Sequence, residues 1–305
     1  MHAHAHVLTG DRRSDSSRRM RVALAINVGM LAVEGIGGVL TGSLAVLADA
    51  GHLLSDVGSI GLALFAATLA SRPAAGRMTF GYQRSEILAA LVNGLLLVAV
   101  ALAVAVAAFS RFGDPPEIDG GGVLALGLLG LLGNVAATAV LARGERVDVN
   151  LEGVLRHSAA DALGSLGVVL AGVFVLLGGS PIVDPIVSLA IAGLILLSSW
   201  RLIAEPVGVL MEAAPTGIDV DAAGAAICEE GGVRSVHDLH IWTVTSGFGA
   251  LAAHVVVARD CDRDLVRRRI ELLLHERFGI EHTTLQMEEE ASGELLHVEN
   301  AVDQL

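Results

Sequence analysis

Six long apolar stretches occupy the first two thirds of the chain, at about residues 20–41, 43–70, 85–111, 121–142, 151–178 and 183–204. A helix needs roughly 20 mostly apolar residues to cross the hydrocarbon core of a bilayer, so each stretch is long enough to span it. Helices are favoured there because backbone polar groups have to be satisfied within the segment. The sequence therefore predicts a polytopic α-helical membrane protein whose transmembrane domain, residues 20–205, is a bundle of six helices.

Charge divides the chain into two parts. Residues 1–204 hold 13 arginines and 14 acidic residues, whereas residues 205–305 hold 7 arginines and 19 acidic residues. A near-neutral apolar part followed by an acidic part indicates a membrane domain joined to a soluble domain, which we place at residues 206–290. The acidic balance argues against nucleic acid as a partner.

Arginines gather in every second loop, which predicts the orientation in the membrane. Five lie before or at the very start of the first stretch, three lie between the second and third, two lie between the fourth and fifth, and Arg201 ends the sixth. The positive-inside rule then places both termini and the soluble domain in the cytoplasm, with the protein in the cell inner (cytoplasmic) membrane. Residues 1–19 and 291–305 are expected to be polar tails. The histidines in the first tail either catch metal loosely or belong to a plain tail; they are His2, His4 and His6.

Two of the apolar stretches carry a histidine and an aspartate four residues apart. These pairs are His52 with Asp56 and His157 with Asp161. Residues four apart share a helix face, and a charged group within a bilayer costs about 2.5–3.5 kcal/mol even on a lenient insertion scale, so it normally faces a partner or a cavity. Two packed helices would bring together two imidazoles and two carboxylates. That set of four nitrogen and oxygen ligands suits a tetrahedral zinc site.

Other polar residues lie within the same stretches. Asp49 precedes His52 by three residues on the same helix face, and it is either a proton or ion relay or an interfacial carboxylate in water. For Glu34 we favour a hydrogen-bonded helix-packing residue over one that lines the same cavity. Three asparagines are expected to hydrogen-bond between helices; they are Asn27, Asn93 and Asn134.

After Glu205-Pro206 the pattern becomes that of a soluble domain. Residues 220–230 and 262–278 read as helices, the first capped by Asp219. Three segments rich in Val, Ile and Thr read as strands; they are residues 233–245, 248–258 and 280–287. The order αββαβ predicts a small two-layer α+β domain.

The chain resembles a known family, the cation diffusion facilitators. Within that family it resembles the bacterial group that exports zinc, cadmium and cobalt. The similar runs are LTGSLAVLADAGHLLSD (40–56), TFGYQRSEILAALVNG (79–94), RHSAADALGSLGV (156–168), EPVGVLMEAAP (205–215) and VHDLHIWTVTSG (236–247). The resemblance covers nearly everything from about residue 20 to 290. It implies a homodimer of six-helix protomers with metallochaperone-like cytoplasmic domains, which exports a divalent metal in exchange for protons.

The resemblance also assigns site residues. His52, Asp56, His157 and Asp161 match the family's transport site, and a histidine at the first position favours Zn²⁺, with Cd²⁺ and Co²⁺ as further substrates. Two departures from the family pattern argue against additional sites. Residues 71–84 contain no His, Asp or Glu, and residues 143–150 contain no His.

The predicted hairpin carries three histidines. If it turns at residues 246–247, residue 237 pairs near 256, so His254 is a diagonal neighbour of His237 on one face. The odd separation of His237 and His240 predicts opposite faces. Glu288 resembles the acidic residue that completes the family's regulatory site. We therefore expect His237, His254 and Glu288 to bind regulatory zinc, with His240 as a further candidate; the alternative is plain histidines on a sheet.

Two other classes of function compete with transport. An intramembrane metalloprotease needs a general base beside its metal, usually in an HExxH run, and the sequence has none. A metal-sensing receptor without transport is the alternative that stays open. We expect a secondary active transporter that exports Zn²⁺ against protons, with no enzymatic activity and no cofactor beyond the zinc that it carries or senses.

Overall fold

The computed structural model describes the backbone of residues 5–142, 151–245 and 247–289, and the side chains of residues 22, 24–139, 161–245 and 247–289. The chain divides into two compact units. The first comprises residues 1–72 and 88–204, and the second comprises residues 73–87 and 205–305.

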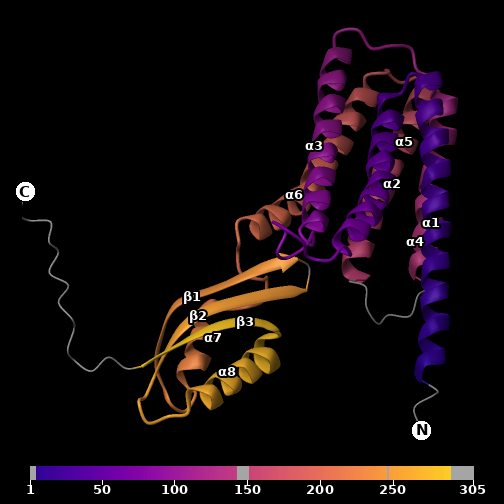
Figure 1. Ribbon diagram of the computed structural model, residues 1–305. Coiled ribbons are helices and arrows are strands. Elements are labelled where there is room, and N and C mark those ends of the chain that lie inside the picture. The colour runs from indigo at the N-terminus through magenta and orange to yellow at the C-terminus, as the bar shows by residue number, and fades with distance from the viewer. Residues whose placement is uncertain (1–4, 143–150, 246, 290–305) are drawn as a thin grey trace, which may run out of the picture. The chain divides into compact units, whose positions relative to one another are not determined.

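Six long helices build the first unit and run alongside one another in Figure 1. They are α1 (Ala5–Thr41), α2 (Leu44–Ala70), α3 (Ser85–Arg111), α4 (Gly120–Ala142), α5 (Leu151–Leu176) and α6 (Val183–Leu210). Among the described residues, five helices are long and apolar enough to cross a membrane, and α5 adds the apolar segment Asp161–Leu176. The predicted polytopic helical fold is therefore confirmed. Two helices are longer than predicted, since α1 starts within the polar tail at Ala5 and α6 continues through Pro206.

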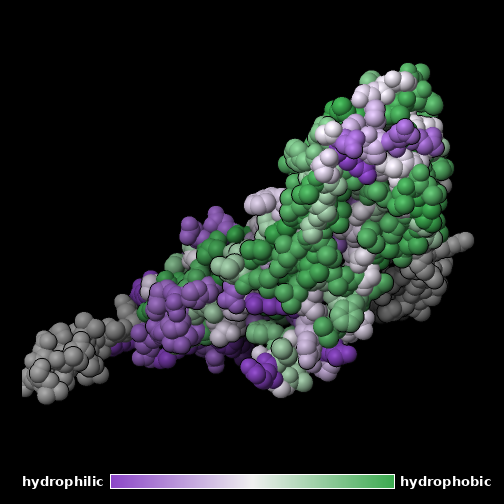
Figure 2. Space-filling view, turned by 90° about the horizontal axis from the view of Figure 1, so that it is seen from above, coloured by the Kyte–Doolittle hydropathy of each residue, from purple (hydrophilic) through white to green (hydrophobic). Residues whose placement is uncertain are grey.

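The outer surface of these helices is apolar. Figure 2 shows hydrophobic side chains spread widely over the visible face of the helical unit. Large apolar residues on all six helices are more than half exposed; examples are Leu40 on α1, Phe65 on α2, Phe109 on α3 and Leu197 on α6. Soluble proteins rarely expose apolar surface on this scale, whereas lipid tails cover such a surface in a bilayer.

Glycines let α4 and α5 pack at very short range. A Cβ placed on Gly172 would lie 2.5 Å from the backbone nitrogen of Leu124, and one on Gly127 would lie 2.8 Å from that of Val169. Contacts this short leave no room for a side chain, so the two backbones meet directly. Small residues at such contacts are how membrane helices associate when no water drives them together.

A buried aspartate ties the start of α2 to α6. The carboxylate of Asp184, which is 1% exposed, accepts hydrogen bonds from the Ser43 hydroxyl (2.5 Å) and from the backbone nitrogen of Leu44 (2.8 Å). A third comes from the backbone nitrogen of Ala45 (3.3 Å), and the guanidinium of Arg111 on α3 lies 3.4 Å away. The first amides of a helix have no partner within it, so an anion is stabilising there. Asp184 therefore joins three helices at one end of the unit.

The second unit is the expected α+β domain. Its elements are α7 (Val220–Cys228), β1 (Val233–Thr245), β2 (Phe248–Val257), α8 (Arg263–Phe278) and β3 (His282–Glu289). The sheet order is β1-β2-β3, with β1 antiparallel and β3 parallel to β2. Both helices pack on one core with the sheet, which includes Ile227, Leu251 and Ile270. The predicted order αββαβ is confirmed, and Asp219 caps α7 as expected.

We expect Asp184→Ala to destabilise the helical unit. The change leaves a buried hydroxyl, two amides and a guanidinium without their acceptor, which should cost about 3 kcal/mol. The midpoint of thermal unfolding of the detergent-purified protein should fall by several degrees. Asp114→Ala, at an exposed acidic residue in the loop before α4, is the matched control and should leave the midpoint unchanged. Equal midpoints for the two variants would contradict this role.

Candidate metal centres

The first cluster of possible metal ligands lies inside the helical unit. His52 and Asp56 are one turn apart on α2, and Asp161 on α5 faces them. The Nε2 atom of His52 lies 2.9 Å from Asp161 Oδ1 and 3.8 Å from Asp56 Oδ2. One ligand atom from each residue lies within 4.8 Å of the others. The structure thus brings together three of the four residues predicted from the two His-Asp pairs.

The fourth predicted ligand, His157, has a side chain that lies outside the described residues. Its position on α5 is four residues before Asp161, so the helix places both residues on one face. His52 is 9% exposed, and Asp56 and Asp161 are partly buried. An imidazole and two carboxylates that converge in a largely dry site form a donor set suited to zinc, which binds nitrogen and oxygen ligands in a compact shell.

Two of the three asparagines link helices beside this cluster, as expected. Asn93 on α3 accepts a hydrogen bond from the hydroxyl of Ser55 on α2 at 3.1 Å. Asn134 on α4 donates to the hydroxyl of Ser165 on α5, also at 3.1 Å. These bonds hold α2 and α5, which carry the ligands, against their neighbours.

A second cluster lies on the sheet of the α+β unit. His237 on β1, His254 on β2 and Glu288 on β3 each offer a ligand atom within 4.8 Å of the others. His254 Nδ1 lies 2.8 Å from Glu288 Oε1, and His237 Nε2 lies 3.5 Å from Glu288 Oε2. His237 is exposed, whereas the other two are half-buried. The structure therefore brings together the three residues predicted for this site.

The register of the hairpin differs from the predicted one. His237 pairs directly with His254, because the ladder shifts between Thr243 and Thr245 and again between His237 and His240. The second shift is a bulge that contains Asp238, whose φ of 52° is in the left-handed region. A bulge adds one residue to a strand and so reverses the alternation of its side chains.

This bulge corrects the prediction for His240. Its partner is Ala252, which lies on the same face of β2 as His254, so His240 and His237 share a face after all. His240 Nε2 contacts Asp238 Oδ1 at 3.1 Å, and the other oxygen of Asp238 lies 3.9 Å from His254 Nε2. Asp238 is the residue that sequence reasoning missed. An aspartate within a strand was the available signal, because this residue type is rare in strands and tolerates the left-handed region.

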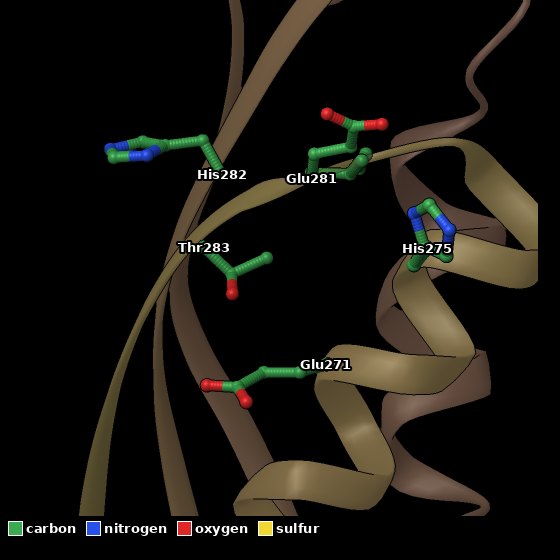
Figure 3. Close-up of a pocket in the computed structure, with 6 residues that line it drawn as sticks. Glu271, His275, Glu281, His282 and Thr283 are labelled. Atoms are coloured by element: carbon green, nitrogen blue, oxygen red, sulfur yellow. The ribbon is translucent and has the colours of Figure 1, made fainter.

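A pocket of about 530 Å³ between α8 and β3 also collects ionisable side chains (Figure 3). Glu271 and His275 come from α8, whereas Glu281 lies just before β3 and His282 begins it. Their side chains do not converge on one point in Figure 3. The ring of His282 instead packs edge-on against Phe248, with 5.7 Å between centroids. We assign no metal to this pocket.

Zinc should stabilise the α+β unit through the sheet cluster. A ligand at a hundred times its Kd adds about 2.7 kcal/mol to the free energy of unfolding. A fragment of residues 205–290 should therefore melt at a higher temperature with zinc, and His237→Ala/His254→Ala should abolish the shift. His275→Ala, at an exposed histidine of α8, is the control and should keep it. If excess zinc did not change the melting temperature of the fragment, His237 and His254 would be plain surface histidines without a metal role.

Comparison with known proteins identifies families and relatives that are similar to this chain. The family model described as the cation efflux transmembrane domain matches residues 20–211, and the model for the cation efflux protein cytoplasmic domain matches residues 215–290. A cadmium, cobalt and zinc/H(+)-K(+) antiporter of Bacillus velezensis is 39% identical over 88% of this chain and 87% of its own length.

Two further relatives have similar coverage. The zinc transporter ZitB of Escherichia coli is 36% identical over 94% of this chain and 92% of its own length. The metal cation efflux system protein CzcD of Cupriavidus metallidurans is 35% identical over 93% of this chain and 89% of its own length. Both halves of the fold are therefore matched along nearly their full extent, and the chain belongs to the cation efflux, or cation diffusion facilitator, family.

Proposed function

We propose that this protein exports divalent metal cations, Zn²⁺ foremost, from the cytoplasm in exchange for protons. The observation that carries the proposal is the buried cluster of His52, Asp56 and Asp161, held by two apolar helices that are packed side by side. Such groups are costly inside a membrane unless an ion or a partner satisfies them. The relatives are named as transporters and antiporters of zinc, cadmium and cobalt, which supports the same activity here.

Exchange with protons follows from the chemistry of the ligands. Imidazole and carboxylate bind a metal only when they are deprotonated, so metal ions and protons compete for the same atoms. A site that opens alternately to each side would load zinc where protons are few and release it where they are abundant. The inward proton gradient then drives the export of metal.

The donor set supports zinc as the main substrate. Nitrogen and oxygen ligands suit Zn²⁺, and the same softness admits Cd²⁺ and Co²⁺. We assign His157 to the fourth position because of its place on α5, one turn before Asp161. The cluster of His237, His254 and Glu288 is assigned to cytosolic zinc that regulates transport.

The remaining assignments are a homodimer in the inner membrane, with both termini and the α+β unit in the cytoplasm. The match to the cytoplasmic-domain model of the family supports the dimer, and the distribution of arginines supports the orientation. A metal-sensing receptor and a metalloprotease are disfavoured because the relatives over nearly the whole chain are named as transporters.

Transport in everted membrane vesicles tests this function. Vesicles that carry the protein should take up Zn²⁺ when a pH gradient, acid inside, is imposed, and uptake should stop when the gradient is collapsed. Cd²⁺ and Co²⁺ run in parallel give the metal preference. A receptor or an enzyme would show no uptake above that of vesicles without the protein.

Asp56→Ala and Asp161→Ala should each abolish this uptake, because they remove one of two carboxylates that neutralise the divalent charge. The loss should exceed the roughly 10–100-fold that removing a hydrogen-bond partner of a metal ligand typically costs. Asp114→Ala, remote from the cluster in sequence and exposed, is the control for expression and insertion. Full uptake by either ligand variant, at a matched amount in the membrane, would refute the assignment.

A further inference from the structure

A second buried polar cluster lies within the helical unit. Asn134 on α4 donates to the hydroxyl of Ser165 on α5, and that hydroxyl donates to Asp49 Oδ2 on α2 at 3.0 Å. Glu34 on α1 lies beside them and is 3% exposed, while Asp49 is 5% exposed. The predicted alternative of an interfacial Asp49 in water is therefore wrong. Four helices contribute one polar side chain each to this interior site.

Glu34 has no hydrogen-bond partner among the side chains that the structure describes. Both of its carboxylate oxygens are buried, and neither is bonded to any residue whose side chain the structure describes. The expectation that Glu34 is a hydrogen-bonded packing residue is therefore wrong. The carboxylate lies against Gly130 of α4 and takes up the room that a side chain at this position would need. A Cβ placed there would lie 2.7 Å from Glu34 Oε1, 3.4 Å from Ser165 Oγ and 3.6 Å from Asp49 Oδ2.

The two buried carboxylates of this cluster, Glu34 and Asp49, need a positive charge to neutralise them. The helix α4 carries no titratable residue between Gly120 and Ala142. The acidic residue that α2 contributes to this cluster, beside Glu34, is Asp49. An ionised Glu34 would thus be buried next to another carboxylate, with no hydrogen-bond donor among the described side chains, at a high cost in free energy. One proton, bound as an O–H on Glu34, removes the charge of one of the two carboxylates. A hard cation such as Ca²⁺ or Mg²⁺ needs about six oxygen ligands. The hydroxyl of Ser165 and Oδ2 of Asp49 are already engaged with each other.

The cluster is one helical turn from the metal ligands. Asp49 precedes His52 by three residues on α2, a rise of about 4.5 Å along the helix. Ser165 follows Asp161 by four residues on α5. Because rigid helices join the two sites, a divalent charge bound at the first lowers the affinity of the second for a proton, since Coulomb repulsion is poorly screened in a dry interior.

We infer that Glu34, paired with Asp49, is a proton-binding site separate from the metal ligands, and that its proton is exchanged for the transported metal. This inference rests on the proposed function. When Zn²⁺ binds, the carboxylic acid of Glu34 releases its proton to water and becomes a carboxylate beside the new positive charge. When Zn²⁺ leaves on the other side, the carboxylate takes a proton from that side. Each cycle returns the protein to its starting state, with one Zn²⁺ moved outward and one proton moved inward through Glu34.

Glu34→Gln tests the inference in the full-length protein reconstituted into liposomes. Glutamine keeps the size of the side chain but cannot exchange a proton. Two assays separate its effects: exchange of radioactive zinc for zinc without a pH gradient, and zinc accumulation driven by a pH gradient. We expect exchange near the wild-type rate and gradient-driven accumulation reduced by about tenfold or more. Glu117→Gln, at an exposed loop residue, should leave both assays unchanged.

An infrared difference spectrum of zinc binding gives a readout that does not depend on transport. The wild-type protein should lose the C=O band of a protonated carboxylic acid when zinc binds. That band should be missing from Glu34→Gln and shifted in Glu34→Asp, which keeps an exchangeable proton on a shorter side chain.

Each contrary outcome overturns the inference. Wild-type accumulation by Glu34→Gln, or an infrared band that persists in it, would show that the exchanged proton lies elsewhere. Loss of zinc exchange in both Glu34→Gln and Glu34→Asp would make Glu34 part of the metal site or of the packing. If zinc accumulation depended on a gradient of K⁺ and not on one of protons, the ion exchanged for zinc would be an alkali ion and not a proton. Failure of the wild-type protein to carry zinc at all would instead refute the proposed function.

Discussion

Burying a charged group in the interior of the helical unit costs free energy unless a hydrogen bond or an opposite charge satisfies it. The contacts between the helices follow from how each of these groups finds such a partner. The contact of 2.9 Å between His52 and Asp161 joins α2 to α5. Asp184 joins α6 to the start of α2 because it accepts hydrogen bonds from amides that a helix leaves unpaired. Lipid tails are as apolar as the side chains of the core, so polar contacts and close backbone approach supply the specificity that water would otherwise supply.

The same constraint separates two kinds of interior site. The cluster of His52, Asp56 and Asp161 contains an imidazole, which suits a borderline cation such as zinc. The cluster of Glu34 and Asp49 offers oxygens alone, and the carboxylate of Glu34 has no partner among the described side chains. Since α2 and α5 contribute to both clusters, a charge bound at one cluster changes the electrostatic energy of an ion at the other. Coupling between two ions then needs no long pathway, only two sites on shared rigid helices.

The sheet cluster follows different physics because water reaches it. His237 is exposed, and His254 and Glu288 are only half-buried, so an empty site costs little and the unit keeps its core from Ile227, Leu251 and other apolar residues. The histidines are aligned by the ladder of β1 and β2 and the carboxylate by β3. A site of this kind suits a reversible response to the concentration of free metal rather than transport of each ion.

Local properties of the sequence determined much of this protein. The length of the apolar stretches predicts the membrane helices, and spacings of four residues place His52 with Asp56 and position 157 with Asp161 on helix faces. Alternation and caps predict the αββαβ order, and composition separates the acidic unit from the membrane unit. Each of these inferences depends only on neighbours within one or two turns or strands.

The tertiary structure decided what depends on residues far apart or on a single irregular one. It brought Asp161 to His52 across 109 positions. It also left Glu34 buried with no hydrogen-bond partner within the described part of the chain, although a hydrogen-bonded packing role was expected. A bulge at Asp238 moved His240 to the face of His237, because one extra residue reverses the alternation of a strand. Periodicity cannot foresee such an insertion, and it cannot say which helix faces meet, because both are settled by packing among whole elements.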